Sequence, residues 1–253
     1  MVDFQELIGW LLVFTRLSAF VVTAPFFSIK GIPSLVKIGL AVLLTVIIGP
    51  FVPMDIIPVS MLGLVFLIAK EVVVGLLLGF TAGLIFQAIK IGGELIDIQM
   101  GFAMASLFDP ISNTRVTLIG QFQYYYAILL YLVLNGHHSL ILAIVRSFQL
   151  VPLGSAMLSG ILAQHFISIF LGMFAVAFKI AAPVIAVLII SDISLGLVAR
   201  TVPQLNVFML GFPIKAALGM LVVALLLPLL AGIVTDLMTQ IEKDLLIVME
   251  SLS

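Results

Sequence analysis

The sequence predicts an all-α protein of the polytopic integral membrane type, a bundle of long, kinked hydrophobic helices. Hydrophobic residues make up 63% of the 253 residues and charged residues only 9%, whereas a soluble domain carries about 25% charged residues. The mean hydropathy is +1.38, and the apolar runs are too long for ordinary strands. A soluble globular enzyme and a disordered chain are therefore excluded, because polar side chains are too few to coat a water-soluble fold.

Charge and motifs exclude further classes of function. The net charge of −1 lacks the basic excess that nucleic-acid binding needs, so no nucleic-acid partner is expected. The absence of cysteine removes disulfides, thiolate metal sites and cysteine nucleophiles. The sequence contains no HExxH, GxSxG, P-loop or dinucleotide fingerprint, so neither an enzyme nor a cofactor is predicted. The adjacent His137 and His138 lack a third ligand nearby, and no metal site is predicted.

Six hydrophobic segments are expected to form helices. The first follows Asp3 and Glu6, where a signal peptide would be basic, so it is interpreted as a retained membrane segment. Three uncharged runs, 38–54, 72–89 and 216–235, have lengths near the ~17–25 residues that cross a hydrocarbon core. A turn is expected at 135–138 and another at 152–155. The segments are Leu7–Phe27, 38–54, Met61–Ile89, Val116–Leu134, Gly160–Ile190 and 216–235.

Some of these helices are too long for a perpendicular crossing. A helix over Ser60–Ile91 would reach ~48 Å, against ~30 Å of hydrocarbon. Such helices must break, tilt or leave the bilayer. Pro183, Pro213 and Pro228 lie inside apolar stretches, and each removes a backbone donor, so kinked or discontinuous helices are expected there.

Five charged residues are flanked on both sides by apolar residues. A charge at the centre of a bilayer costs about 2.5–3.5 kcal/mol on the more lenient scale. A single lysine near a helix end can extend to the interface. For the whole set, burial in protein is favoured, by pairing within the chain, along a water-filled path or against partner subunits. These residues are Arg16, Lys70, Glu71, Lys179 and Lys215.

Small residues recur on one helix face. Gly75, Gly79 and Gly83 are spaced every four residues, a pattern that lets helix backbones approach closely. Packing within the chain is favoured over a subunit contact. Beyond them, Lys90, Glu94 and Asp97 form either a solvated helix end or the polar rim of a pore, and the sequence does not separate the two.

An apolar stretch rich in Met, Phe and small residues runs from 100 to 110. It is too short to span a bilayer and too hydrophobic for a free loop, so a re-entrant element and an interfacial helix both remain open. Flexible Met and flat Phe side chains could fill a constriction and part when something larger arrives. The residues singled out are Met100, Gly101, Phe102, Met104, Phe108, Asp109 and Pro110.

A second stretch carries a resemblance to a known family. It runs Ala199-Arg200-Thr201-Val202-Pro203-Gln204-Leu205-Asn206-Val207-Phe208 and continues to Gly211-Phe212-Pro213-Ile214-Lys215. With these residues the chain resembles FliR, the flagellar type III export-gate family, whose virulence counterpart is SctT. The stretch from Met100 to Pro110 and Asn135-Gly136-His137 agree with it. The likeness covers essentially the whole chain, 1–253, as one domain.

The resemblance implies a non-enzymatic core subunit of the flagellar export gate, in the bacterial inner membrane at the flagellar basal body. FliP and FliQ would be its partners, with FlhB beside them and membrane lipid around the assembly. Unfolded flagellar proteins would pass through the channel. Residues at about 100–121 correspond to the family's pore-plugging loop, with Phe102, Met104 and Phe108 as gate-filling side chains. Partner subunits would then shelter the misplaced charges.

The candidates for subunit contact come from the glycine face, the charged step before it and the second motif. They are Gly75, Gly79, Gly83, Lys70, Glu71, Arg200, Pro203, Gln204, Asn206 and Lys215. Two alternatives differ in function. A polytopic secondary transporter for a small solute would also show intramembrane charges and broken helices, although the absence of paired repeats disfavours it. A purely structural membrane anchor would leave permeability unchanged when the loop is altered.

Overall fold

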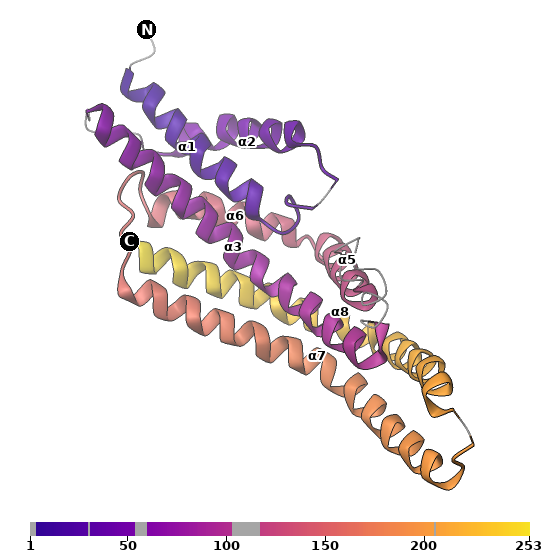
Figure 1. The fold of residues 1–253 in the computed structure, drawn as a ribbon. Helices are drawn as coiled ribbons and strands as arrows, with labels where there is room; N and C mark the ends of the chain where they lie inside the picture. Colours follow the sequence, from indigo (N-terminus) through magenta and orange to yellow (C-terminus); the bar gives the residue numbers. More distant parts are fainter. Residues whose placement is uncertain (1–3, 30, 54–59, 103–116, 205) are drawn as a thin grey trace. The chain divides into compact units, whose positions relative to one another are not determined.

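The computed structural model describes residues 4–29, 31–53, 60–102, 117–204 and 206–253. These residues form helices and turns, with no strand among them, which confirms the all-α prediction (Figure 1). Long helices dominate the C-terminal half. In chain order the elements are α1 Phe4–Thr23, α2 Ser34–Ile48, the short 3-10 helix η1 Gly49–Phe51, α3 Met61–Met100, α5 Leu118–Val133, α6 Gly136–Leu150, α7 Gly160–Thr201 and α8 Val207–Leu252.

The chain divides into two compact units, each assembled from separate stretches of sequence. Unit 1 contains Met1–Ile85, Tyr131–Phe170 and Leu237–Ser253. Unit 2 contains Phe86–Leu130 and Leu171–Asp236. The long helices α3, α7 and α8 each contribute to both units. The turn expected at 152–155 is confirmed between α6 and α7. Of the turn expected at 135–138, only Asn135 lies in a turn, with a left-handed conformation (φ 59°), because α6 begins at Gly136.

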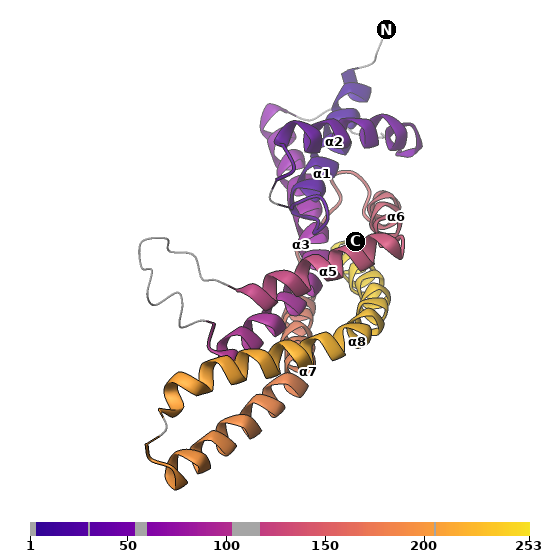
Figure 2. The ribbon, with the colours of Figure 1, turned by 90° about the vertical axis from the view of Figure 1, so that its right-hand side faces the viewer.

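Unit 1 is organised around one face of α1. Leu12, Val13, Leu17 and Phe20 are buried, and their spacing of one, four and three residues is that of a single helical stripe. The C-terminal half of α1 contacts α3 at Gly75 and Gly79, and the two helices lie beside each other (Figures 1 and 2). On α2 the buried stripe is narrower, and several of its large apolar side chains remain exposed.

Unit 2 has a core drawn from four helices. Ile96 and Met100 from α3, Ile119 from α5, Val184 from α7 and Val223 from α8 are all buried in one cluster. In both ribbon views α7 and α8 run side by side toward the turn at 202–206 (Figure 2). This core determines where the C-terminal end of α3 and the first turn of α5 lie.

The helices are longer and less interrupted than expected. α7 continues through Pro183 to Thr201, and α8 continues through Pro213 and Pro228 to Leu252. Of the two outcomes expected at these prolines, a kink or a break, the break does not occur, since each proline removes a backbone donor without ending the helix. The expected ends near 89, 190 and 235 were also wrong, because a charged residue does not stop a helix: Lys is a good helix former, and Asp costs at most about 0.7 kcal/mol relative to Ala.

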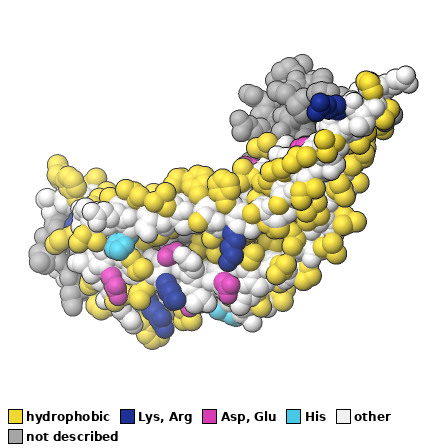
Figure 3. All heavy atoms as spheres, turned by 90° about the horizontal axis from the view of Figure 1, so that it is seen from below, with side chains coloured by type: hydrophobic (Ala, Val, Ile, Leu, Met, Phe, Trp, Pro, Cys, Tyr) yellow, Lys and Arg dark blue, Asp and Glu magenta, His cyan; other side chains and the backbone are white. Residues whose placement is uncertain are grey.

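The surface agrees with a membrane-type bundle. Among the described residues, five helices are long and apolar enough to cross a membrane, and the broken pair α5 and α6 gives a sixth. The face in Figure 3 is dominated by hydrophobic side chains with few charged ones. α2, α7 and α8 are especially rich in exposed large apolar residues. Such surface requires lipid or partner helices rather than water. The five helices are Gln5–Thr23, Ser34–Phe51, Met61–Met100, Gly160–Thr201 and Met209–Leu252.

Candidate functional site

The predicted gate segment begins at the buried end of α3. Met100 is fully buried in the core of unit 2. Gly101 follows with φ 90°, in the left-handed region that favours glycine, and its N–H donates to the carbonyl of Ile98 at 3.1 Å. Phe102 packs edge-on against Phe212 of α8, with ring centroids 6.1 Å apart. The chain therefore leaves α3 by a glycine turn beneath an aromatic contact. The other gate candidates, Met104, Phe108, Asp109 and Pro110, lie outside the described residues.

The far end of the same stretch is held by a carboxylate. Asp97 on α3 is 1% exposed and accepts hydrogen bonds from the backbone N–H groups of Ile119 (3.0 Å) and Gly120 (3.1 Å). These N–H groups belong to the first turn of α5, where no partner within the helix is available. A negative charge is also favourable at a helix N-terminus. Asp97 therefore fixes the start of α5 to α3.

A close backbone contact supports this junction. A Cβ atom on Gly93 would overlap the backbone of Gly120, so α3 and α5 approach each other too closely for any side chain at position 93. Lys90 and Glu94, on the same part of α3, form an ion pair at 3.8 Å with both side chains about one-third exposed. Lys90 and Glu94 thus form a partly solvated ion pair within α3, which continues to Met100. Asp97, by contrast, is buried and bonded to the backbone N–H groups of Ile119 and Gly120.

A second polar cluster joins three helices of unit 2. The Nζ atom of Lys215 on α8 lies 2.9 Å from Oδ1 of Asp192 on α7. Gln99 on α3 donates through Nε2 to Oδ2 of the same carboxylate at 3.1 Å. The side chain of Asp192 is 42% exposed. Lys215, expected at a subunit contact, is thus paired within the chain.

The second sequence motif forms the turn between α7 and α8. Arg200, Pro203, Gln204 and Asn206 are exposed. The side-chain oxygen of Asn206 accepts from the backbone N–H of Met209 at 3.3 Å, which is the arrangement of a helix N-cap. Exposure leaves Arg200, Pro203 and Gln204 available for a partner, while Asn206 has a local role at the start of α8.

The buried charges of unit 1 neutralise each other. Arg16 on α1 and Glu71 on α3 are both fully buried, and Nε of the arginine lies 2.6 Å from the carboxylate. Nη1 of Arg16 donates to the carbonyls of Ser147 (3.0 Å) and Val151 (2.9 Å) at the end of α6. The backbone N–H of Gly154 donates to Oε1 of Glu71 at 2.8 Å. The pair therefore ties α1, α3 and the α6–α7 connection together.

The pairing shows that the charge of Glu71 is balanced within the chain. Glu71, a candidate for subunit contact, has no exposed side-chain surface, so its charge is balanced within the chain rather than by a sister subunit. Lys70 is exposed and donates to the carbonyl of Gly154 at 3.0 Å. The expectation that partner subunits shelter every misplaced charge therefore does not hold for Arg16, Glu71 or Lys215.

The glycine face packs mainly inside unit 1. A Cβ atom on Gly75 would overlap the carbonyl oxygen of Arg16, and one on Gly79 would overlap the side chain of Thr23. A Cβ atom on Gly83 would have its nearest neighbour, the carbonyl oxygen of Thr23, 3.8 Å away, which is an ordinary van der Waals contact. The first two glycines therefore serve the α1–α3 contact.

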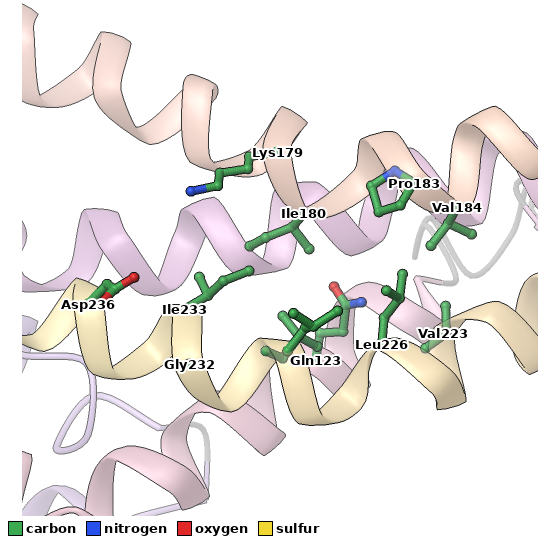
Figure 4. A pocket seen from close by; sticks show the side chains of 12 residues that line it. Gln123, Lys179, Ile180, Pro183, Val184, Val223, Leu226, Gly232, Ile233 and Asp236 are labelled. Carbon is green, nitrogen blue, oxygen red and sulfur yellow. The ribbon is translucent and has the colours of Figure 1, made fainter.

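Unit 2 also contains a cavity of about 380 Å³. Lys179 of α7 and Asp236 of α8 line it from two helices, Gln123 enters from α5, and the other lining residues are mostly aliphatic (Figure 4). Oε1 of Gln123 is buried and has no hydrogen-bond partner among the described residues. Among the described residues, no group of three His, Cys, Asp or Glu side chains lies close enough to hold a metal ion.

Comparisons with known proteins identify the family. The sequence profile of the family described as "Bacterial export proteins, family 1" matches residues 7–241. The chain belongs to this family. It is 42% identical to the flagellar biosynthetic protein FliR of Bacillus subtilis (strain 168) over 216 residues, covering 83% of each chain. It is 32% identical to the protein of that name from Escherichia coli (strain K12) over 245 residues, covering 94% of this chain and 92% of the relative. A third relative so named, from Aquifex aeolicus (strain VF5), is 34% identical, covering 89% and 88%.

The sequence motifs drew attention to the stretch from Met100 onward, but not to the residues that hold its neighbouring helices together. Sequence reasoning singled out the stretch from Met100 onward, yet it assigned Asp97 no specific partner and placed Gln99 in no site. The signal for Asp97 was present: an acidic residue in an apolar helix must find hydrogen-bond donors. The sequence could not show that these donors are the first N–H groups of α5, 22 residues later.

Proposed function

We propose that this chain is a core subunit of the flagellar type III export gate, forming with FliP and FliQ, beside FlhB, the channel for unfolded flagellar proteins. The observation that carries the proposal is the family match over residues 7–241, together with relatives named as flagellar biosynthetic proteins that align over most of their length. The site of action is the inner membrane at the flagellar basal body. The proposed role is that of channel wall and stopper.

The surface supports assembly with other hydrophobic helices. Large apolar side chains of α7 and α8, such as Ile193, Leu197 and Met209, are more than half exposed. α8 is 46 residues long, or ~69 Å at the rise of an α-helix, which exceeds ~30 Å of hydrocarbon. A helix of that length with an apolar surface needs protein around the part that lipid does not cover.

The proposed stopper is the stretch at about 100–121. The resemblance supplies its role. Of the described residues on either side of 103–116, Gly101 has a positive φ of 90° and α5 begins at Leu118. Opening would shift the population from a closed packing to an open one. Deletion of Gly101–Thr114 is expected to permit assembly and to make the membrane leaky to small ions.

Two measurements test the proposal. Native mass spectrometry of the chain co-expressed with FliP and FliQ is expected to give one hetero-oligomeric complex. Ion conductance of membranes carrying the deletion is expected to rise above that of the intact gate. A stable monomer that binds a small solute would instead support a transporter. Assembled deletion gates with unchanged conductance would remove the stopper from the proposal.

A further inference from the structure

One of the five charges that the sequence places among apolar residues has no partner among the residues that the structure describes. The other four contact polar groups of the chain: Arg16, Lys70, Glu71 and Lys215. Lys179 is exposed and forms no ion pair with a described residue. Asp236, in the same unit, is likewise exposed and outside every ion pair of the described chain. Two opposite charges of unit 2 are therefore available to a group outside the chain.

These two charges lie at one end of the cavity of unit 2. Figure 4 shows Lys179 and Asp236 toward that end and Val184 and Val223 toward the other. Apart from the two charged residues and Gln123, the lining residues are Ile, Leu, Val and Pro, with one Gly. Because both charged residues are exposed, the charged end opens to the surface. The cavity thus combines a charged end of both signs with an aliphatic body.

The size of the cavity limits what can fill it. An empty apolar cavity leaves the atoms of its wall without van der Waals partners on one side. Sites for small molecules have volumes of ~300–1,000 Å³, and this cavity measures about 380 Å³. One turn of an α-helix with its side chains, ~11 Å wide and ~5.4 Å long, fills ~500 Å³. The cavity therefore fits a flexible chain and excludes a helix of another subunit.

We propose that this cavity binds a zwitterionic phospholipid, with an acyl chain along the aliphatic wall, the phosphate beside Lys179 and the ammonium group beside Asp236. Burial of each CH₂ group of the chain is favourable. A headgroup that carries both charges complements the charged end, whereas a purely anionic one meets Asp236 with like charge. α7 and α8 are apolar and long enough to cross a membrane, so lipid is at hand. The site does not depend on the proposed gate function, because none of its residues belongs to the stretch at about 100–121.

Gln123 places one polar group in the wall of the cavity. Its side chain is 2% exposed, and Oε1 has no hydrogen-bond partner among the described residues. In Figure 4 it lies between the charged end and Val223. The ester group of a phospholipid likewise lies between the headgroup and the acyl chain. Since an amide carries an NH₂ donor as well as an acceptor, Gln123 can donate to the ester carbonyl.

The test uses the full chain reconstituted in vesicles, alone and co-expressed with FliP and FliQ. The vesicles contain phosphatidylethanolamine with a photoactivatable group on the acyl chain, and labelled peptides are mapped by mass spectrometry. Gly232→Leu fills the cavity, because Gly232 lines it and a Cβ there meets no atom within 4 Å. Gly196→Leu is the matched control: this exposed glycine of α7 is equally open but does not line the cavity.

The label is expected on the peptides that contain Val184 and Val223. Gly232→Leu should lower this labelling at least about tenfold, because loss of room for two CH₂ groups, each worth about fourfold in affinity, already gives that factor. Gly196→Leu should leave it unchanged. If Gly232→Leu does not accumulate, Leu229→Trp narrows the cavity from an exposed lining position and should lower labelling in the same way.

Competition with unlabelled lipids tests the headgroup. Lys179→Gln should weaken competition by phosphatidylethanolamine and by anionic phosphatidylglycerol about twofold to fivefold, as loss of a partly exposed charge pair predicts. Asp236→Asn should remove the preference for phosphatidylethanolamine over phosphatidylglycerol. Arg146→Gln, which changes an exposed arginine of unit 1, is the control and should alter neither competition.

Three results would count against the lipid site. Equal labelling in Gly232→Leu and Gly196→Leu would mean that lipid contacts only the outer surface of the helices. Loss of the label when FliP and FliQ are present would mean that a partner side chain fills the cavity. A label that Gly232→Leu removes, but whose competition is insensitive to Lys179→Gln and Asp236→Asn, would overturn the assignment of a zwitterionic headgroup.

Discussion

Breaking the buried pair between Arg16 and Glu71 should destabilise unit 1 strongly. Both side chains are fully buried, so Arg16→Met leaves a carboxylate in a dry interior and Glu71→Met leaves a guanidinium there. Removal of one partner of a buried ion pair costs about 3–5 kcal/mol. Each single substitution is therefore expected to lower the free energy of unfolding by that amount.

The double variant is the informative comparison. Arg16→Met with Glu71→Met leaves no buried charge, although the carbonyl of Val151 and the N–H of Gly154 lose their partners. An unpaired buried polar group costs about 1–3 kcal/mol. The double variant should thus lose clearly less stability than the two single losses added together, giving a coupling energy of several kcal/mol.

Denaturant unfolding in detergent would measure these differences. The chain has a single tryptophan, Trp10, which lies on α1 in the same helix as Arg16, so its fluorescence reports on unit 1. Arg146→Met, which removes an exposed arginine of α6, is the control and should change stability little. Additive losses in the double variant, or single variants as stable as the control, would refute the assignment of this pair as one buried unit.

Three further predictions concern smaller contacts. Gly79→Ala should destabilise the chain, since a Cβ there overlaps α1, whereas Gly83→Ala meets only an ordinary contact and should be neutral or stabilising in the same unfolding assay. Asn206→Ala should cost about 0.5–2 kcal/mol by loss of the α8 cap, and Asn206→Asp should restore most of it. Asp192→Ala should cost only about 0–1 kcal/mol, because its pair is partly exposed, and a loss as large as that of a buried pair would contradict this.

Composition and spacing predicted much of the fold. The low charge and long apolar runs predicted the all-α class, and the turns at Asn135 and at 152–155 were placed correctly, since polar and turn-forming residues interrupt apolar runs there. Helix ends were predicted poorly. Charges at Lys90, Asp192 and Asp236 were used as boundaries, whereas the helices continue through all three.

Contacts between residues far apart in the sequence could not be predicted from the sequence alone. Arg16 and Glu71 were both recognised as misplaced charges, but their separation of 55 positions gave no sign that they meet. The same holds for Asp97 and the start of α5. Side-chain burial predicts that a partner must exist, whereas the identity of the partner depends on how the helices pack.

The central claim, that this chain is built to assemble with other export-gate subunits, is tested most directly by the mass of its complexes. Co-expression with FliP and FliQ, purification through a tag on this chain and native mass spectrometry should yield one defined hetero-oligomer containing all three proteins. Recovery of this chain alone, as a stable monomer in a nanodisc under the same conditions, would contradict the account.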